Sequence, residues 1–250
     1  MSEFANTVDL LGDDVVLASI VNKTITEFKD DKVTFVGPYA FNYCKDLETV
    51  DIPNATYIAR FGFNQSKLTS LNAPKVTRVF AQGLSSANLT ELCLPELTFA
   101  TTQAFSSNNF VSVKLPKYTG KGRVKEPMTD NSERNNGDKI FAYCRQLKRV
   151  DFPALEYMYV DMFYGCNSLT EIILRNTKIV STYNNSILLG TPFADGNGHI
   201  YVPKSLLSDD DETKDYRRAT NWTIYANQFR ALEDYTVDGT VTGELDESKI

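Results

Sequence analysis

The residues LETVDIPNATYIARFGFNQSK (47–67) are followed without interruption by LTSLNAPKVTRVFAQGLSSAN (68–88) and LTELCLPELTFATTQAFSSNN (89–109). Three further segments align with them, beginning at residues 110, 147 and 169, and an earlier copy with a looser start covers 25–46. Three successive spacings are 21 residues, one is 37 and one is 22. Self-similarity at a period of roughly 20 to 50 residues indicates a repeat protein in which each copy is one structural unit.

Each copy alternates inward and outward positions up to a proline. In the copy that starts at Leu47, Val50 and Ile52 are placed to point inward, because side chains alternate between the two faces of a strand. Proline ends each strand because it cannot donate to the ladder of hydrogen bonds, and it recurs as Pro53, Pro74, Pro95, Pro116 and Pro153. About ten residues later a large apolar residue recurs to fill the core, as Phe41, Phe63, Leu84, Phe105, Phe141 and Phe163. No copy buries its apolar face alone, so the copies are predicted to stack into a solenoid.

The stretches PYAFNYCKDLETVDIP (38–53) and KIFAYCRQLKRVDFP (139–153) carry a resemblance to a known family. In spacing and residue type they resemble the BspA-like leucine-rich repeats of bacterial surface proteins. The resemblance covers about residues 25–193 and implies a curved solenoid, with a parallel sheet on the concave face and short strands or turns on the convex face. Single copies depart from the pattern, since Leu84 replaces the phenylalanine and Arg175 replaces the proline.

Four regions are expected along the chain. Residues 1–24 are predicted to form an N-terminal helical cap, because Leu and Val recur at helical intervals over 8–21. Residues 25–193 are the solenoid of about seven copies, with an insertion at 117–139 whose Gly, Asn and charged residues predict a surface loop. Residues 194–235 resemble the capping segment often found after these repeats, with a strand, a proline stop, two helical segments and Trp222 plugging the last coil. Residues 236–250 are acidic and poor in aromatics, which predicts a flexible tail.

The composition excludes some partners. The net charge of −6 argues against nucleic acid and anionic membranes, which both need a basic surface. The longest apolar run, VVLASIV (15–21), is far shorter than the roughly 20 residues that cross a bilayer, so no membrane insertion is expected. The first residues, MSEFANTVDLLGDD, lack the basic and apolar regions of a secretory signal. A cytoplasmic protein, a phage structural protein and a chain whose leader has been removed all fit that observation.

The reactive side chains do not form a recognisable catalytic or metal-binding motif. Cys44, Cys144 and Cys166 share one position of the repeat, where buried reduced thiols are favoured over a disulfide between Cys144 and Cys166. No fourth sulfur or histidine shares that position, so no metal site is predicted. His199, the only histidine, stands at no recognisable spacing from Cys93 or a serine. The acidic run DDDE (209–212) is interpreted as a solvated face. We therefore predict no catalytic residue and no cofactor.

The outward strand positions are the candidate binding surface. One column reads Asp51, Asn72, Cys93, Lys114, Asp151 and Ile173, and its neighbour reads Thr49, Ser70, Glu91, Ser112, Arg149 and Glu171. Their mixed charge and small polar side chains suit a protein or glycan partner, although the same residues are also compatible with mere solvation. A rival convex patch is offered by Tyr157, Tyr159 and Tyr164.

Three classes of function follow, in order of preference. The first is a non-enzymatic module that binds a protein or glycan through its concave face, with adhesion at a cell surface or virion implied by the family resemblance. The second is a structural or accessory component of a phage tail or prophage-encoded particle. An enzyme acting through His199 or Cys93 is a distant third.

Overall fold

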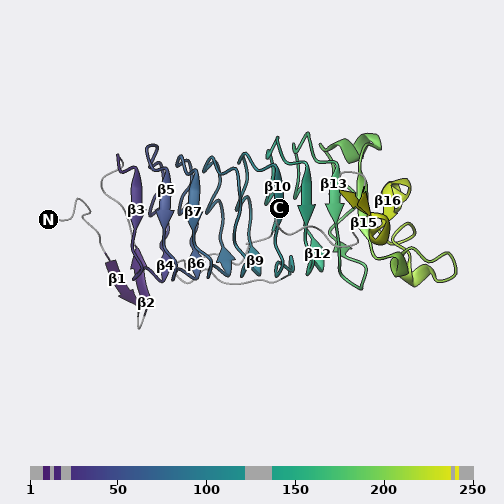
Figure 1. Ribbon diagram of the computed structural model, residues 1–250, viewed down its shortest axis with the longest axis horizontal. Helices are drawn as coiled ribbons and strands as arrows, with labels where there is room; N and C mark the ends of the chain where they lie inside the picture. Colours follow the sequence, from purple (N-terminus) through teal and green to yellow (C-terminus); the bar gives the residue numbers. More distant parts are fainter. Residues whose placement is uncertain (1–7, 12–13, 18–23, 122–136, 238–239, 242–250) are drawn as a thin grey trace.

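The structure is a computed structural model, and its described residues are 8–11, 14–17, 24–121, 137–237 and 240–241. It is an elongated stack of coils with two rows of short strands on opposite long sides (Figure 1). We call the first row the ladder face; it contains β3 (Glu27–Lys29), β5 (Thr49–Asp51), β7 (Ser70–Asn72), β10 (Ser112–Lys114), β11 (Arg149–Asp151), β13 (Glu171–Ile173), β15 (His199–Val202) and β16 (Phe229–Ala231). The second row, the opposite face, contains β4 (Phe35–Val36), β6 (Tyr57–Ile58), β8 (Arg78–Val79), β9 (Phe99–Ala100), β12 (Tyr157–Met158) and β14 (Ser181–Thr182).

Neighbouring strands within both rows pair in parallel. The ladder face contains the sheets β3-β5-β7 and β10-β11-β13-β15-β16, while the opposite face contains the run β4-β6-β8-β9 and the pair β12-β14. Parallel pairing follows from the repeat, because each coil returns to the same side of the molecule in the same direction. The alternation predicted from the sequence is confirmed on the ladder face, where the central residues Val50, Val113, Val150 and Ile172 are at most 2% exposed.

Five of the coils turn at a proline. The amide of Ala55 donates to the carbonyl of Ile52 (3.0 Å), and the amide of Leu155 donates in the same way to Phe152 (3.2 Å). Proline is therefore the second residue of a β-turn, where its fixed φ is favoured. The proline both ends the ladder-face strand and directs the chain toward the opposite face.

The predicted column of large apolar residues fills the core. All six of its members are fully buried: Phe41, Phe63, Leu84, Phe105, Phe141 and Phe163. The rings of Phe41 and Phe63 stack at 4.7 Å between centroids, and Phe141 stacks on Phe105 at 5.2 Å and on Phe163 at 5.9 Å. The core therefore runs through the stack as a chain of contacts between neighbouring coils.

The predicted N-terminal helix is wrong. The chain forms two antiparallel strands there, β1 (Val8–Leu11) and β2 (Asp14–Leu17), and β2 pairs in parallel with β4. The β-branched residues Val8, Val15 and Val16 favour strands, and the open edge of β4 supplies backbone partners that a helix could not use. Residues 12–13 and 18–23, also covered by the helix prediction, lie outside the described part of the chain.

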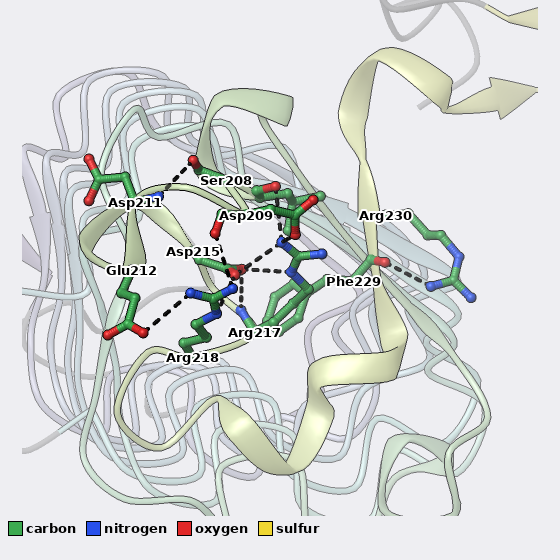
Figure 2. Close-up of polar contacts among 10 residues, drawn as sticks. Ser208, Asp209, Asp211, Glu212, Asp215, Arg217, Arg218, Phe229 and Arg230 are labelled. Carbon is green, nitrogen blue, oxygen red and sulfur yellow. Dashed lines mark hydrogen bonds and ion pairs between the residues drawn. The ribbon is translucent and has the colours of Figure 1, made fainter.

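The C-terminal cap is also not helical in the way predicted. Throughout the described residues the helical segments are short 3₁₀ turns: Pro192–Asp195, Lys204–Leu206, Glu212–Lys214, Thr223–Gln228 and Leu232–Asp234. In the acidic stretch, side chains take the backbone amides that a helix would use. The amide of Asp211 donates to the Ser208 hydroxyl (3.1 Å), and the amide of Arg217 donates to the Asp215 carboxylate (3.0 Å) (Figure 2). Such local bonds compete with helix formation.

Two other predictions for this end have different outcomes. Trp222 is fully buried, as predicted, and its indole N–H donates to the carbonyl of Val180 (2.8 Å). The expected tail begins with a short antiparallel pair, β17 (Thr236–Val237) and β18 (Thr240–Val241). The rest of the tail, and residues 122–136 of the predicted insertion, lie outside the described residues.

Candidate binding surface

The parallel register places each outward ladder-face residue beside its counterpart in the next coil. The first column runs through Glu27, Thr49 and Ser70, and then through Ser112, Arg149, Glu171 and His199. The second column runs through Lys29, Asp51 and Asn72, and then through Lys114, Asp151, Ile173 and Tyr201. The two columns therefore bring together the predicted residues, except Glu91 and Cys93, in two blocks of strands.

The coil between the two blocks does not form a ladder-face strand. Glu91 and Cys93 are both exposed there, but the segment 91–94 is irregular. At the start of this coil the Leu89 amide donates to the side-chain oxygen of Asn108 (3.0 Å). A side chain thus takes a backbone amide just before the position of the strand.

Charges are paired within the columns at the N-terminal end. Lys29 Nζ lies 2.8 Å from Asp51 Oδ2, and the Asn72 side-chain amide donates to Asp51 Oδ1 (2.7 Å). These hydrogen bonds, that from Lys29 first, hold the pKa of Asp51 below its usual range. The carboxylate stays ionised at neutral pH and is balanced by its neighbours, so this end of the face is polar without a strong charge of either sign.

The C-terminal end of the columns is partly buried. Asp151 is 1% exposed and Ile173 is fully buried, so neither presents an exposed side chain on the surface predicted for them. Burial raises the pKa of Asp151, while the Arg175 side chain opposes that rise from 3.1 Å. Within the first column, Arg149 donates to Glu171 at 2.6 Å.

The residues that cover this end come from the chain's own C-terminal region. We call Leu232–Tyr235 the cover segment. Tyr235 is 2% exposed, its hydroxyl lies 3.1 Å from Glu171 Oε2, and its ring packs edge-on against Tyr201 at 4.6 Å. The Arg149 guanidinium lies over the same ring, 5.6 Å from its centroid. Of the predicted residues, Asp151 and Ile173 are therefore buried, and Arg149 and Glu171 stay partly exposed beside the cover segment. The other eight form the accessible candidate surface away from that segment: Thr49, Asp51, Ser70, Asn72, Glu91, Cys93, Ser112 and Lys114.

Four column residues were missed by the sequence prediction. Glu27 and Lys29 extend the columns at the N-terminal end, and His199 and Tyr201 extend them at the C-terminal end. The signal was present in both places, because ITEFKDD (25–31) and HIYVP (199–203) alternate apolar and polar residues as the other copies do.

The cysteines are all free. Cys93 is exposed on the ladder face, whereas the other three are buried. The Cys144 thiol donates to the carbonyl of Phe105 (3.4 Å), and the Cys166 thiol donates to the carbonyl of Phe141 (3.0 Å). Burial raises the pKa of Cys144 to about 12 and also raises that of Cys166. The buried thiols therefore act as small apolar groups with a satisfied hydrogen bond.

Residues of the acidic run contact arginines, and His199 lies beside a tyrosine. Asp209 and Asp215 both accept hydrogen bonds from Arg217, and Glu212 pairs with Arg218 (Figure 2). His199 is exposed beside Tyr201, with 6.1 Å between the ring centroids. Among the described residues, no three His, Cys, Asp or Glu side chains gather as a metal site would require. The same residues contain no helix with the length and apolarity to cross a bilayer.

The rival aromatic patch packs largely on itself. Tyr157 and Tyr159 meet edge-on at 4.7 Å, and Tyr164 packs against Tyr143 at 5.6 Å. The three predicted tyrosines are half-buried, whereas Tyr39, Tyr43, Tyr143 and Tyr183 are exposed.

Comparisons with known proteins address the fold. The chain matches the family model described as BspA type leucine rich repeat region, with 6 copies, over residues 19–122 and 123–190. It resembles the crystal structure of a leucine-rich repeat protein from Bacteroides ovatus, with a TM-score of 0.58 and 20% identity over 82% of the chain. The chain spans 58% of the length of that protein. A leucine rich cell surface protein from Faecalibacterium prausnitzii matches at a TM-score of 0.33 and 12% identity over 68% of each chain. No curated protein matches.

Proposed function

Because the chain belongs to the BspA-type leucine-rich repeat family, we propose that it is a non-enzymatic module that binds a protein or glycan partner through its ladder face. Leucine-rich repeat modules generally mediate interactions, and stacked repeats present extended surfaces suited to binding. The observation that carries the proposal is the alignment of outward residues in register, which creates a surface continuous over several coils.

The chemistry of the accessible residues supports this class of partner. Ser70, Asn72 and Ser112 offer small hydrogen-bonding groups, while Glu91 and Lys114 add charges of both signs. Such a surface has no excess of positive charge for a polyanion, and its hydrogen-bonding groups suit a protein or a glycan. We assign the ladder face as the concave face of the stack and adhesion at a cell or virion surface as its role. The structural phage component remains the competing assignment.

A charge-matched pair of triple variants tests the proposal. The ladder variant carries Ser70→Arg, Asn72→Arg and Ser112→Arg, three changes that place bulky cations on the accessible columns. The control variant carries Gln65→Arg, Ser86→Arg and Ser107→Arg at the turns between coils. Wild type and both variants are applied to a glycan microarray and to immobilised bacterial surface proteins. We expect the ladder variant to lose at least tenfold in affinity for whatever the wild type binds, and the control to retain it.

The proposal is wrong if the two variants bind alike. Loss in both would indicate that added charge alone weakens binding, and retention in both would place the binding surface elsewhere. Circular dichroism of each variant establishes that the fold is intact before binding is compared. Specific assembly with tail proteins of a phage, and with no glycan or surface protein, would favour the phage component.

A further inference from the structure

The cover segment belongs to a cluster of its own, separate from the core. Tyr235 and Ile173 are the buried members of that cluster, with Tyr201 and Leu232 packed against them, and none of them belongs to the main core. The ladder-face strands below, in contrast, contribute Val150, Ile172 and Ile200 to the main core on their other side. Displacement of the cover segment therefore leaves the packing of the coils unchanged.

The surface under the cover segment is specific for a tyrosine side chain. Glu171 accepts the hydroxyl at 3.1 Å, the Arg149 guanidinium lies over the ring, and Tyr201 meets the ring edge-on. A phenylalanine would leave the Glu171 oxygen without this hydrogen bond, and an aliphatic residue would lose the cation–π contact as well. Ile173 completes the site as its apolar floor.

The neighbouring residues favour an acidic segment. The Glu233 carboxylate accepts a hydrogen bond from the Lys204 backbone amide at 2.9 Å, and Asp234 follows it with an exposed side chain. Arg149 and Arg175 both lie at this end of the face, each paired with one carboxylate of the columns. A short turn with acidic residues directly before a tyrosine, as in the 3₁₀ turn Leu232–Asp234, matches this arrangement of groups.

We propose that the C-terminal end of the ladder face is a docking site for a short acidic turn that ends in a tyrosine. In this structure the cover segment occupies that site in the same chain, and the corresponding segment of a partner displaces it. Displacement uncovers Ile173 and extends the accessible columns from β10 to β15. This inference rests on the proposed function only in treating the ladder face as the binding surface.

A peptide with the sequence of residues 231–237, ALEDYTV, is the probe. It carries a fluorescent label at its N-terminus, and its anisotropy is measured with full-length wild type and with Tyr235→Ala. We expect Tyr235→Ala to bind the peptide at least tenfold more tightly than wild type, because its own cover segment no longer competes. A peptide in which alanine replaces the tyrosine, ALEDATV, should show no such gain. The matched control, Tyr183→Ala, removes an exposed tyrosine elsewhere and should behave as wild type.

Equal affinity of wild type and Tyr235→Ala for the peptide would overturn the proposal. Hydrogen exchange of the wild-type protein provides a second test that does not depend on the variant. We expect the amides of the cover segment, including that of Tyr235, to exchange at least tenfold faster than those of β13. Exchange at the rate of β13 would show that the cover segment opens only on global unfolding, which also overturns the proposal. Neither failure affects the test with Ser70, Asn72 and Ser112, which lie outside the covered area.

Discussion

The turns between coils hold many non-glycine residues in the left-handed conformation. They occupy two positions of the repeat, four residues apart, with φ from 51 to 62°. The first position is held by Tyr39, Phe61, Gln82, Gln103, Lys139 and Asp161. The second is held in five coils by Tyr43, Gln65, Ser86, Ser107 and Tyr143. At such positions the amide donates to the next coil, as from Tyr43 to the carbonyl of Asn64 (2.9 Å) and from Ser86 to that of Ser106 (2.8 Å). The stacking of coils therefore imposes a conformation that costs non-glycine residues about 1–2 kcal/mol each.

Glycine at one of these positions should stabilise the protein. We expect Ser86→Gly to raise the free energy of unfolding by about 0.5–1 kcal/mol, since the relief of backbone strain exceeds the entropic cost of glycine. Gly165→Ala tests the reverse, because at a φ of 74° a Cβ would lie 2.7 Å from the ring of Tyr143, and we expect a loss of about 1–2 kcal/mol. Urea titration measures both changes. Thr90→Gly, outside these turns, is the control, and destabilisation by Ser86→Gly to the same extent would contradict the explanation.

The cysteines should differ sharply in reactivity. Cys93 is exposed, whereas Cys44, Cys144 and Cys166 are fully buried. With a pKa of about 12, the thiolate form of Cys144 is only about one part in ten thousand at pH 8. A colorimetric thiol reagent at pH 8 should therefore titrate one thiol rapidly in the folded protein and four in denaturant. Rapid reaction of a second thiol in the folded state would contradict the burial of Cys44, Cys144 and Cys166.

At the scale of elements, the C-terminal cap depends on one buried carboxylate. Asp215 is fully buried and accepts hydrogen bonds from the Arg217 side chain at 2.8 and 3.0 Å, and Arg218 approaches it to 3.3 Å. Arg217 also donates to the carbonyl of Leu207 (3.1 Å), so that a single arginine joins two turns of the cap. The hydrogen bond from Arg217, more than any other contact, holds the pKa of Asp215 below its usual range.

This carboxylate predicts an acid-sensitive cap. A depressed pKa in the folded state adds stability that is present above the unfolded pKa of about 4 and is lost as the pH falls through the lower folded value. We expect the free energy of unfolding, followed by fluorescence of Trp222, to fall below about pH 4 in wild type. Asp215→Asn should be less stable at pH 7 by about 1.5–3 kcal/mol and should lose less between pH 5 and pH 2. Parallel pH profiles of the two proteins would assign the acid sensitivity to other carboxylates.

At the scale of the whole molecule, each coil is stabilised mainly by its contacts with the coils next to it. The stacked pairs Phe41–Phe63 and Phe141–Phe163 lie in different halves, and the sheets of the ladder face are interrupted between β7 and β10. In a stack of repeats each coil contacts mainly its neighbours, so a local loss of packing has its largest effect nearby.

Two matched core substitutions test this dependence on neighbouring coils. Phe63→Ala should destabilise the N-terminal half by about 3–5 kcal/mol, because it leaves a cavity beside Phe41. Since Trp222 reports on the C-terminal half, we expect the circular dichroism transition in urea to shift to lower urea while the fluorescence transition moves little. Phe163→Ala should shift both. Coincident shifts of both signals in Phe63→Ala would show that the stack unfolds as one cooperative unit.

The repeat, its alternation and its buried column followed from the sequence alone. These features depend on contacts between equivalent positions one period apart, as between Val50 and Leu71 or between Phe41 and Phe63, so one copy predicts the environment of the next. The proline turns are also local, because a fixed φ acts within four residues.

Only the tertiary structure decided what happens where the repeat stops. Strands form where a helix was predicted, because β2 pairs with the edge of β4. In the coil that lacks a ladder-face strand, the Leu89 amide donates to the side chain of Asn108. The covering of Ile173 depends on Tyr235, whose contact with Glu171 joins residues 64 positions apart. Such contacts follow no period, and their energy depends on which surfaces the finished stack leaves open. The sequence therefore predicted the columns, and the ends of the molecule determined how much of them is accessible.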